Sequence, residues 1–473
     1  MNNLCQKNIL VGLFKQIECT VGLFYKYKPF LNVFFIVVFF ASCTPEKKQV
    51  TFSENIAPVI YKNCTSCHRD GEGGGFPLVS YNDVRKKAGT IAIVTQSRAM
   101  PPWPADPAYR HFADEKVLSD EEIKMISTWV ENGCPIGDSL NIPSPPVFND
   151  KTSQLGKPDL SVGFPSKYFI KGNNKDNFLV IKLPYELPQD TFIRTIEFVA
   201  GNKKLLHHMN GNLVVFNPDK KKNVNTGEWY INAEDSFDSH DMHARIGLLH
   251  DDNSYPMLIP SAVNYLPGVY SDKYPDGIGG WHLTRKGVIY INTMHYGPSP
   301  VDDADSSYFN FFFTSTPPKR PMRELILGTI GVAPVVPELV IEPNTVKTFY
   351  TETVINKDIS ITTIVPHMHL IGKKFTAYAV TPQSDTIPLI RINNWDFRWQ
   401  YFYKCKTLLK IPAGSKIRAE GVYDNTEQNP NNPFYPPQLI RDRKGSMRTT
   451  DEMFQLIFNY LEYKDGDENI SLE

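Results

Sequence analysis

The chain has little cysteine, almost no net charge and only one long apolar run. Its 473 residues include 7 cysteines and a single Cys-x-x-Cys pair, so no second pair could complete a four-cysteine zinc site. A formal net charge of -1, without a basic stripe, argues against a nucleic-acid-binding protein. The apolar run lies near the N-terminus, and the rest of the sequence predicts no membrane-spanning helix.

The N-terminal apolar run is typical of an export signal. Lys15, Lys26 and Lys28 precede the apolar residues 31–40, and Ala41-Ser42-Cys43 follows them. This order describes a secretory signal, and the run is short for the alternative, an uncleaved membrane anchor. The cysteine after Ala-Ser resembles the lipobox of bacterial lipoproteins. The sequence therefore predicts an extracytoplasmic protein, held at the periplasmic or outer-membrane face of a bacterial membrane by lipid on Cys43.

The pentapeptide Cys64-Thr65-Ser66-Cys67-His68 is typical of a covalent attachment site for a c-type haem. The thiols of Cys64 and Cys67 can each form a thioether to one porphyrin, and His68 can then bind the iron as an axial ligand. A redox cysteine pair and half of a zinc site are the alternatives. An extracytoplasmic location favours haem c, because bacteria attach this cofactor outside the cytoplasm.

Residues 51–134 are predicted to be helical. Thr51-Phe52-Ser53-Glu54 can cap a helix that ends near Cys64, and Ser119-Asp120-Glu121-Glu122 is a second capping box. Apolar residues at helical spacing follow the second box, and Gly133 provides a stop. A haem motif early and an amphipathic helix late resemble the layout of a single-haem cytochrome c.

A methionine in the loop between these helices is the expected sixth ligand of the iron. Met100 lies in Arg98-Ala99-Met100-Pro101-Pro102-Trp103, where the prolines stiffen the loop and can hold the thioether against the iron. Met125 is the competing candidate. It falls within the late helix, where a core position is the favoured interpretation.

Residues 135–158 are rich in Pro, Ser, Asn and Asp and are interpreted as a linker, after which short alternating or aromatic runs indicate β-sandwiches. The predicted strands are Phe178–Lys182, Thr195–Val199, Leu213–Phe216, Val288–Asn292, Phe309–Phe313, Thr348–Val354, Ser360–Val365 and Phe454–Tyr460. Residues 217–287 are expected to form irregular surface loops. The predicted organisation is a signal peptide (1–42), a small all-α cytochrome c domain (43–134), a linker (135–158) and two antiparallel all-β sandwich, or jelly-roll, domains (159–325 and 326–473).

Several histidines occur at spacings that suit a metal. His367 and His369 follow a predicted strand, and residues i and i+2 of an extended strand share a face. His207 and His208 are adjacent, so they would need a bulge or a turn to reach one ion. His295 follows another predicted strand. Each histidine considered alone could be an ordinary hydrogen-bonded residue.

Other candidates carry less weight. Met453 begins a predicted strand and alone would indicate only a core residue. His240-Asp241-Met242-His243 could be a further metal site, although a solvated polar loop is favoured there. Cys134 and Cys405 lie in separate regions, and the sequence gives no ground for pairing them.

Taken in order, these motifs resemble the copper type II monooxygenases, the relatives of peptidylglycine α-hydroxylating and dopamine β-monooxygenases. The resemblance runs from about residue 159 to 462. The matching segments are Leu206-His207-His208-Met209, Leu266-Pro267-Gly268, Ile278-Gly279-Gly280, Met294-His295-Tyr296-Gly297, His367-Met368-His369-Leu370-Ile371-Gly372 and Asp451-Glu452-Met453.

The resemblance implies two β-sandwich domains that face each other across a cleft and hold two copper ions. By resemblance, the electron-storing copper is bound by His207, His208 and His295. The copper that activates dioxygen is bound by His367, His369 and Met453. The implied reaction hydroxylates an unactivated C–H bond of a small molecule, with one oxygen atom going to the product and one to water.

One departure from the family bears on the substrate. Peptide-amidating members hold a substrate carboxylate with an arginine and a tyrosine, at positions occupied here by Val365 and Ile457. A more hydrophobic substrate than a peptide C-terminus is therefore expected. Electrons would enter the haem from an external donor, which could be a cytochrome, a quinol-linked reductant or an ascorbate-like molecule. The alternatives are a non-catalytic haem and copper electron carrier or copper-binding protein, and a carbohydrate- or protein-binding module that displays a cytochrome.

Overall fold

A computed structural model describes residues 49–473 apart from 149–152, 234–238, 270–274, 276 and 444–447. The chain divides into two compact units, residues 1–50 and residues 51–473. The predicted export signal, including Cys43, lies outside the described residues. In the part of the chain that is described, no helix is long and apolar enough to cross a membrane.

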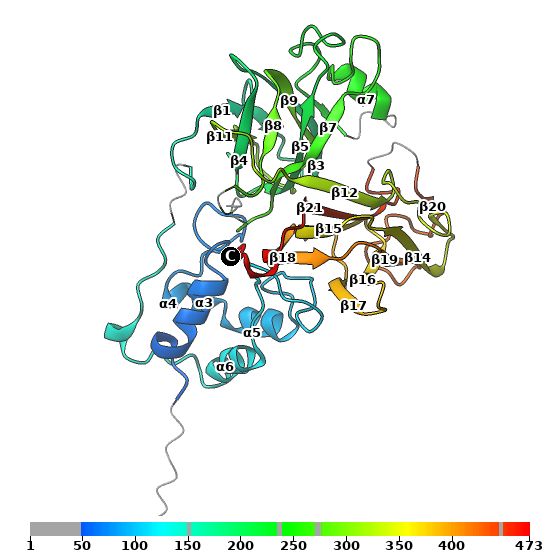
Figure 1. Cartoon of the computed structure of the whole chain (residues 1–473). Helices are drawn as coiled ribbons and strands as arrows, with labels where there is room; N and C mark the ends of the chain where they lie inside the picture. Colours follow the sequence, from blue (N-terminus) through cyan, green and yellow to red (C-terminus); the bar gives the residue numbers. More distant parts are fainter. Residues whose placement is uncertain (1–48, 149–152, 234–238, 270–274, 276, 444–447) are drawn as a thin grey trace, which may run out of the picture. The chain divides into compact units, whose positions relative to one another are not determined.

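The second unit begins with short helices (Figure 1). They are the π-helical turn η2 (Phe52–Ile56), α3 (Ala57–Asn63), α4 (Tyr81–Lys86), α5 (Ala88–Gln96), α6 (Asp120–Glu131) and the 3-10 turn η3 (Ser139–Asn141). Cys64 is the C-cap of α3, as the sequence predicted. Both predicted caps are confirmed, because Thr51 accepts a hydrogen bond from the Glu54 amide and Ser119 forms a reciprocal capping box with Glu122.

The rest of the described chain is mainly antiparallel β-structure. The first strands are β1 (Leu160–Gly163), β2 (Tyr168–Ile170), β3 (Asn177–Glu186), β4 (Thr191–Val199), β5 (Leu206–Val215), β6 (Tyr230–Asn232), β7 (Met257–Tyr265), β8 (Trp281–Leu283), β9 (Lys286–Tyr296), β10 (Asp303–Asp305) and β11 (Tyr308–Thr314). They form a five-stranded sheet in the order β6-β3-β9-β5-β7, a four-stranded sheet in the order β1-β11-β4-β8, and the pair β10-β2.

The later strands form a second set of antiparallel sheets. They are β12 (Arg323–Gly328), β13 (Val340–Ile341), β14 (Thr345–Val354), β15 (Ile359–Met368), β16 (Gly372–Val380), β17 (Thr386–Ile392), β18 (Tyr403–Ile411), β19 (Lys416–Asn425), β20 (Ile440–Arg441) and β21 (Phe454–Glu462), followed by the 3-10 turn η4 (Asp467–Asn469). Two four-stranded sheets result, β12-β21-β15-β18 and β14-β19-β16-β17, with the pair β13-β20. Each predicted strand overlaps an observed one, and buried side chains of all four large sheets belong to one hydrophobic core.

Residues 217–287 are more ordered than the sequence suggested. They contain β6, β7, β8 and the helix α7 (Ser239–Arg245), with a separate apolar cluster that includes Val224, Ile231 and Ile246. The expectation of irregular surface loops was therefore wrong for the parts of this stretch that form β6, α7, β7 and β8. His240–His243 is also not a solvated loop, because it lies in α7, Met242 is buried, and His243 Nε2 is 2.8 Å from the hydroxyl of Tyr290.

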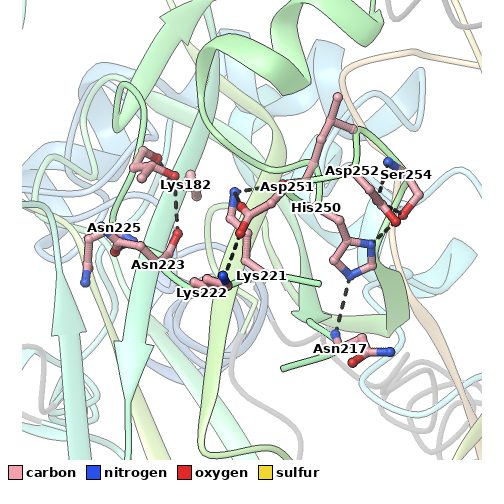
Figure 2. A network of polar contacts seen from close by, with 12 residues as sticks. Lys182, Asn217, Lys221, Lys222, Asn223, Asn225, His250, Asp251, Asp252 and Ser254 are labelled. Atoms are coloured by element: carbon pink, nitrogen blue, oxygen red, sulfur yellow. Dashed lines mark hydrogen bonds and ion pairs between the residues drawn. The ribbon is translucent and has the colours of Figure 1, made fainter. Parts of the chain in front are cut away.

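Polar contacts hold the turns of this stretch in place (Figure 2). The buried ammonium of Lys221 donates to the Leu249 carbonyl at 2.7 Å. His250 Nδ1 lies 2.9 Å from Ser254 Oγ, and His250 Nε2 accepts from the Asn217 amide at 3.4 Å. His250 is thus a hydrogen-bonded structural residue.

The segment between α5 and α6 packs on the second set of sheets. Ala105 pairs with Ile392 at the end of β17, and Phe112 pairs with Cys405 in β18. Ala105 and Phe112 belong to the same hydrophobic core as the β-sheets. Cys405 and Cys134 are both buried free thiols, so the structure contains no disulfide between them.

Candidate functional site

The first histidine cluster lies on neighbouring strands of the five-stranded sheet. His208 in β5 pairs directly with His295 in β9, and the register shifts between Leu206 and His208. The predicted bulge is therefore present at His207. It brings both adjacent imidazoles to the same partner, with ring centroids 4.9 Å apart for His207 and His295 and 5.0 Å apart for His208 and His295.

Surrounding side chains fix the orientation of His295. The ring of Phe178 stacks on it with centroids 4.3 Å apart, and Asp176 Oδ1 lies 2.7 Å from its Nε2. The Nδ1 atoms of His208 and His295 are buried, and neither has a hydrogen-bond partner. Buried nitrogens without partners are costly unless something binds them, and a metal ion satisfies that requirement.

Gly297 explains the His-Tyr-Gly part of the motif. A Cβ at this position would lie 3.2 Å from Cδ2 and 3.3 Å from Nε2 of His207. The adjacent Tyr296 is buried and donates from its hydroxyl to Asp305 at 2.5 Å, which ties the end of β9 to the core. The motif therefore both makes room for an imidazole and anchors the strand that carries His295.

The second cluster lies where β15 ends and β21 begins. The rings of His367 and His369 are 5.0 Å apart. Gln400 Oε1 lies 2.5 Å from His367 Nδ1, and the Asp451 carbonyl lies 2.9 Å from His369 Nδ1. Because both oxygens accept, each Nδ1 carries the proton and each Nε2 presents a lone pair to the site.

Burial sets the protonation state of this pair. It lowers the pKa of His367 to about 3 and that of His369 to about 4. Both imidazoles are therefore neutral at neutral pH, which is the form that binds a metal.

Glu452 holds the second cluster together, and sequence reasoning gave it no role. Its carboxyl group accepts hydrogen bonds from the amides of His369 and Ile371, each at 2.9 Å. It also accepts from the amide of Met453 at 3.3 Å. Burial raises the pKa of Glu452 to about 8. The Asp-Glu-Met motif thus fixes the backbone of Met453 relative to that of His369.

Both clusters open onto one cavity of about 180 Å³. Its wall includes His208 from the first cluster and His367, His369 and Met453 from the second. Val365 and Ile457, which are directly opposite each other on β15 and β21, also line it. The positions that distinguish this chain from the peptide-amidating enzymes are therefore at the cavity.

The ring of Phe397 lies between the two clusters. Its centroid is 6.0 Å from that of His208 and 5.8 Å from that of His369. The nearby carboxamide of Gln400 donates to the Phe397 carbonyl at 2.9 Å. No motif marked Phe397 or Gln400, because both lie in the irregular connection between β17 and β18.

The type and position of the candidate donor atoms indicate which metal the two clusters could hold. Among the described residues, no three His, Cys, Asp or Glu side chains gather their donor atoms as they would around an ion. In the first cluster, His295 Nε2 is engaged by Asp176, so its free donor is Nδ1. In the second, the third candidate donor is the thioether of Met453. Imidazole and thioether together suit copper in both oxidation states, so the chemistry of the residues fits this metal.

The haem motif is placed at the end of α3. His68 Nδ1 lies 3.2 Å from the Phe76 carbonyl, which leaves Nε2 for an axial bond. A Cβ on Gly74 would lie 2.7 Å from His68 Nδ1, so only glycine leaves room for the ring there. The thiols of Cys64 and Cys67 are free, and Cys67 Sγ lies 3.4 Å from the Pro267 carbonyl. Free thiols and a ring nitrogen left for a ligand are what the predicted haem attachment requires of these residues.

Met100 lies on the wall of a second cavity, of about 850 Å³. Trp103, Lys116 and Trp399 also line this cavity, whereas Cys64, Cys67 and His68 do not. Lys116 links this cavity to the haem motif through Gly268. The Lys116 ammonium donates to the Gly268 carbonyl at 2.8 Å, and Gly268 lies so close to the motif that a Cβ on it would touch Cys67 Sγ. The structure thus places Met100 at a cavity beside the motif without joining it to His68.

The remaining isolated histidines have ordinary partners. His111 Nδ1 lies 3.1 Å from the Glu115 carboxylate, and His282 Nε2 lies 3.4 Å from that of Asp190. Both histidines are exposed, and they add no further candidate ligands.

Side chains of both histidine clusters line one open cavity, which is more typical of a reactive site than of a closed structural metal site. Comparison with known families agrees. Residues 332–433 match the family model described as copper type II ascorbate-dependent monooxygenase, C-terminal domain. This stretch contains His367, His369 and Gln400 and ends before Met453. The match supports a copper-dependent oxidoreductase. A search of curated proteins finds no match.

Proposed function

We propose that this protein is a copper-dependent monooxygenase that hydroxylates a C–H bond of a small molecule with dioxygen. The observation that carries the proposal is the shared cavity, which His208, His367, His369 and Met453 all line. The family match over residues 332–433 supports the same activity.

The proposed ligands follow the two clusters. His207, His208 and His295 would hold one copper ion, and His367, His369 and Met453 would hold the other. Bound copper would supply one-electron redox chemistry and the activation of dioxygen. The thioether of Met453 favours Cu(I), whereas three imidazoles accommodate Cu(I) and Cu(II). Gln400, Asp176 and Glu452 orient the ligands and are positioning residues.

The cavity limits the substrate. Its volume of about 180 Å³ is below the roughly 300–1,000 Å³ of common ligand sites, so a small substrate is expected. Val365 and Ile457 form an apolar floor beside His367 and replace a carboxylate anchor. The proposed substrate class is therefore small and mainly apolar.

We further propose that a covalent haem c supplies the electrons. Cys64 and Cys67 would form the thioethers, and His68 and Met100 would be the axial ligands, with His68 presenting Nε2. An external cytochrome, quinol-linked or ascorbate-like reductant would deliver electrons. Lipid on Cys43 would keep the protein at the periplasmic or outer-membrane face of a bacterial membrane, close to such donors.

Metal analysis of the purified full-length protein tests the proposal. Two copper ions and one haem per chain are expected, and copper-free protein with fully occupied haem would overturn the monooxygenase assignment. Untargeted comparison of metabolites with and without copper, under isotopically labelled dioxygen, should reveal a product carrying one labelled oxygen atom.

Met453→Ala separates the enzyme from a non-catalytic electron carrier. The variant should lose oxygen-dependent product formation while its haem is still reduced by an external donor. Met125→Ala is the matched control, because Met125 lies in α6 and lines neither cavity. Full product formation by Met453→Ala would place oxygen activation elsewhere.

A further inference from the structure

One short connection, residues 393–400, forms part of the wall of both cavities. It lies between β17 and β18, and its side chains are divided between the two cavities. Asn393, Asn394, Trp395, Asp396, Arg398 and Trp399 line the cavity that contains Met100. Phe397 and Gln400 line the cavity onto which the histidine clusters open. The connection therefore contributes to the walls of both cavities.

The inner face of this wall contacts both histidine clusters. Phe397 is the one ring that approaches both His208 and His369 among the described aromatic contacts. Gln400 engages His367 Nδ1. Trp395 contacts the second cluster as well, because its indole N–H donates to the backbone carbonyl of His369 at 3.1 Å. A displacement of this connection would therefore alter the packing of both histidine clusters.

The outer face of the wall meets the loop of Met100. The Tyr401 hydroxyl donates to the Pro102 carbonyl at 2.7 Å, and the rings of Tyr401 and Trp103 have centroids 5.1 Å apart. Tyr401 also stacks on Trp399, with centroids 6.4 Å apart and an angle of 13° between the planes. The rings of Trp103, Tyr401 and Trp399 thus form a series of contacts from the Met100 loop to the connection 393–400.

We propose that residues 393–400 carry electrons from the Met100 cavity to the histidine clusters, with Trp399 as the outer and Phe397 as the inner contact. This inference rests on the proposed function, which places a haem beside Met100 and copper in the clusters. In each transfer one electron would pass from haem to copper, so that ferrous haem would become ferric and one Cu(II) would become Cu(I). The external reductant then restores the ferrous haem. The protein's part is to keep donor and acceptor joined by packed side chains.

Anaerobic electron transfer within the full-length protein tests this route without relying on product formation. Protein loaded with oxidised haem and Cu(II) is mixed rapidly with a limiting chemical reductant. Haem absorbance and the Cu(II) electron paramagnetic resonance signal are followed in time. Phe397→Leu and Trp399→Leu should each slow copper reduction about tenfold, equivalent to about 1.4 kcal/mol in the barrier, while reduction of the haem itself is unchanged.

Two controls separate the route from general packing. Phe397→Tyr keeps the ring and should retain the wild-type rate. Phe434→Leu makes the same change at a partly buried core position that lines neither cavity, and it should also leave the rate unchanged. Redox titrations should show unaltered haem and copper potentials in all variants, which excludes a change in driving force.

The outcomes distinguish the route from the function. Wild-type rates in both leucine variants, with haem and copper fully loaded, would overturn the route and leave the monooxygenase proposal standing. If Phe397→Leu fails to bind copper, the rate in Trp399→Leu decides. Wild-type protein without haem would overturn both the haem supply and the route, whereas product formation with a chemical reductant would still support the copper enzyme.

Discussion

Replacing Gln400 with leucine should weaken one of the two proposed copper sites and spare the other. The Gln400 oxygen, 2.5 Å from His367 Nδ1, keeps the proton on that nitrogen and leaves Nε2 for the proposed copper ion. Leucine is close in size but offers no acceptor, so the buried N–H loses its partner at a cost of about 1–3 kcal/mol. Loss of such a supporting hydrogen bond typically lowers metal affinity about 10–100-fold.

The reciprocal change is at Asp176, which supports His295 in the other cluster. Asp176→Ala should weaken the site of His207, His208 and His295 and leave the second site unchanged. The Asp176 side chain is 48% exposed, so solvent screens its charge and the effect should fall at or below about tenfold. Together, the two variants predict a crossed pattern of affinities.

Anaerobic competition between the protein and a Cu(I) chelator measures both affinities in one titration. Gln400→Glu keeps an acceptor oxygen and should retain more affinity than Gln400→Leu. The reasoning fails if Gln400→Leu binds two copper ions as tightly as the wild type, or if it weakens both sites equally. The second outcome would mean that the connection 393–400 supports the whole cleft rather than His367.

Three further changes have defined expectations. Gly372→Ala should lower the free energy of unfolding by about 1–3 kcal/mol in denaturant titrations, because its Cβ would lie 2.8 Å from Trp395 Cδ1. Gly89→Ala, on an open surface of α5, should instead raise it by about 0.5–1 kcal/mol, and equal effects would contradict the packing argument. Arg320→Ala should cost about 3–5 kcal/mol, because it leaves the buried carboxylate of Asp467 without its partner at 2.7 Å. Arg323→Ala, which breaks an exposed pair with Glu462, should cost no more than about 1 kcal/mol, and a similar loss in both would refute the role of burial. Gly74→Ala should alter the axial coordination seen in the spectrum of the proposed haem, because the added methyl would press on His68, whereas Gly89→Ala should leave the spectrum unchanged.

The candidate ligands could be predicted because they occur in short motifs with local geometry. Period-two spacing placed His367 and His369 near one face, and the adjacency of His207 and His208 required the bulge that the structure contains. The helix caps at Thr51 and Ser119 were equally local and are confirmed.

The supporting residues could not be predicted, because their partners are distant in sequence. Gln400 meets His367 only through tertiary packing, and Phe397 reaches His208 only after the two sets of sheets are in place. Glu452 has no periodic signal, since its role is to accept backbone amides from another strand. Such contacts depend on the fold and produce no regular spacing of residues that a sequence motif could reveal.

The stretch 217–287 misled sequence reasoning for a different reason. Pro260 lies inside β7, and proline within a run argues against a strand. However, β7 is the outermost strand of its sheet, in the order β6-β3-β9-β5-β7. An edge strand has amides that need no partner, so it tolerates a proline that a central strand would not.

The pairing of Ala105 and Phe112 with Ile392 and Cys405 governs how the polypeptide can be dissected. A chain cut within residues 135–158 would keep every strand but lose Phe112, which is 1% exposed and packs on the ring of Tyr403. The remaining fragment would expose that apolar face to water and is expected to aggregate. Fragments intended to work alone, or chimaeras with a foreign cytochrome, must therefore retain the native residues 98–117 against β17 and β18.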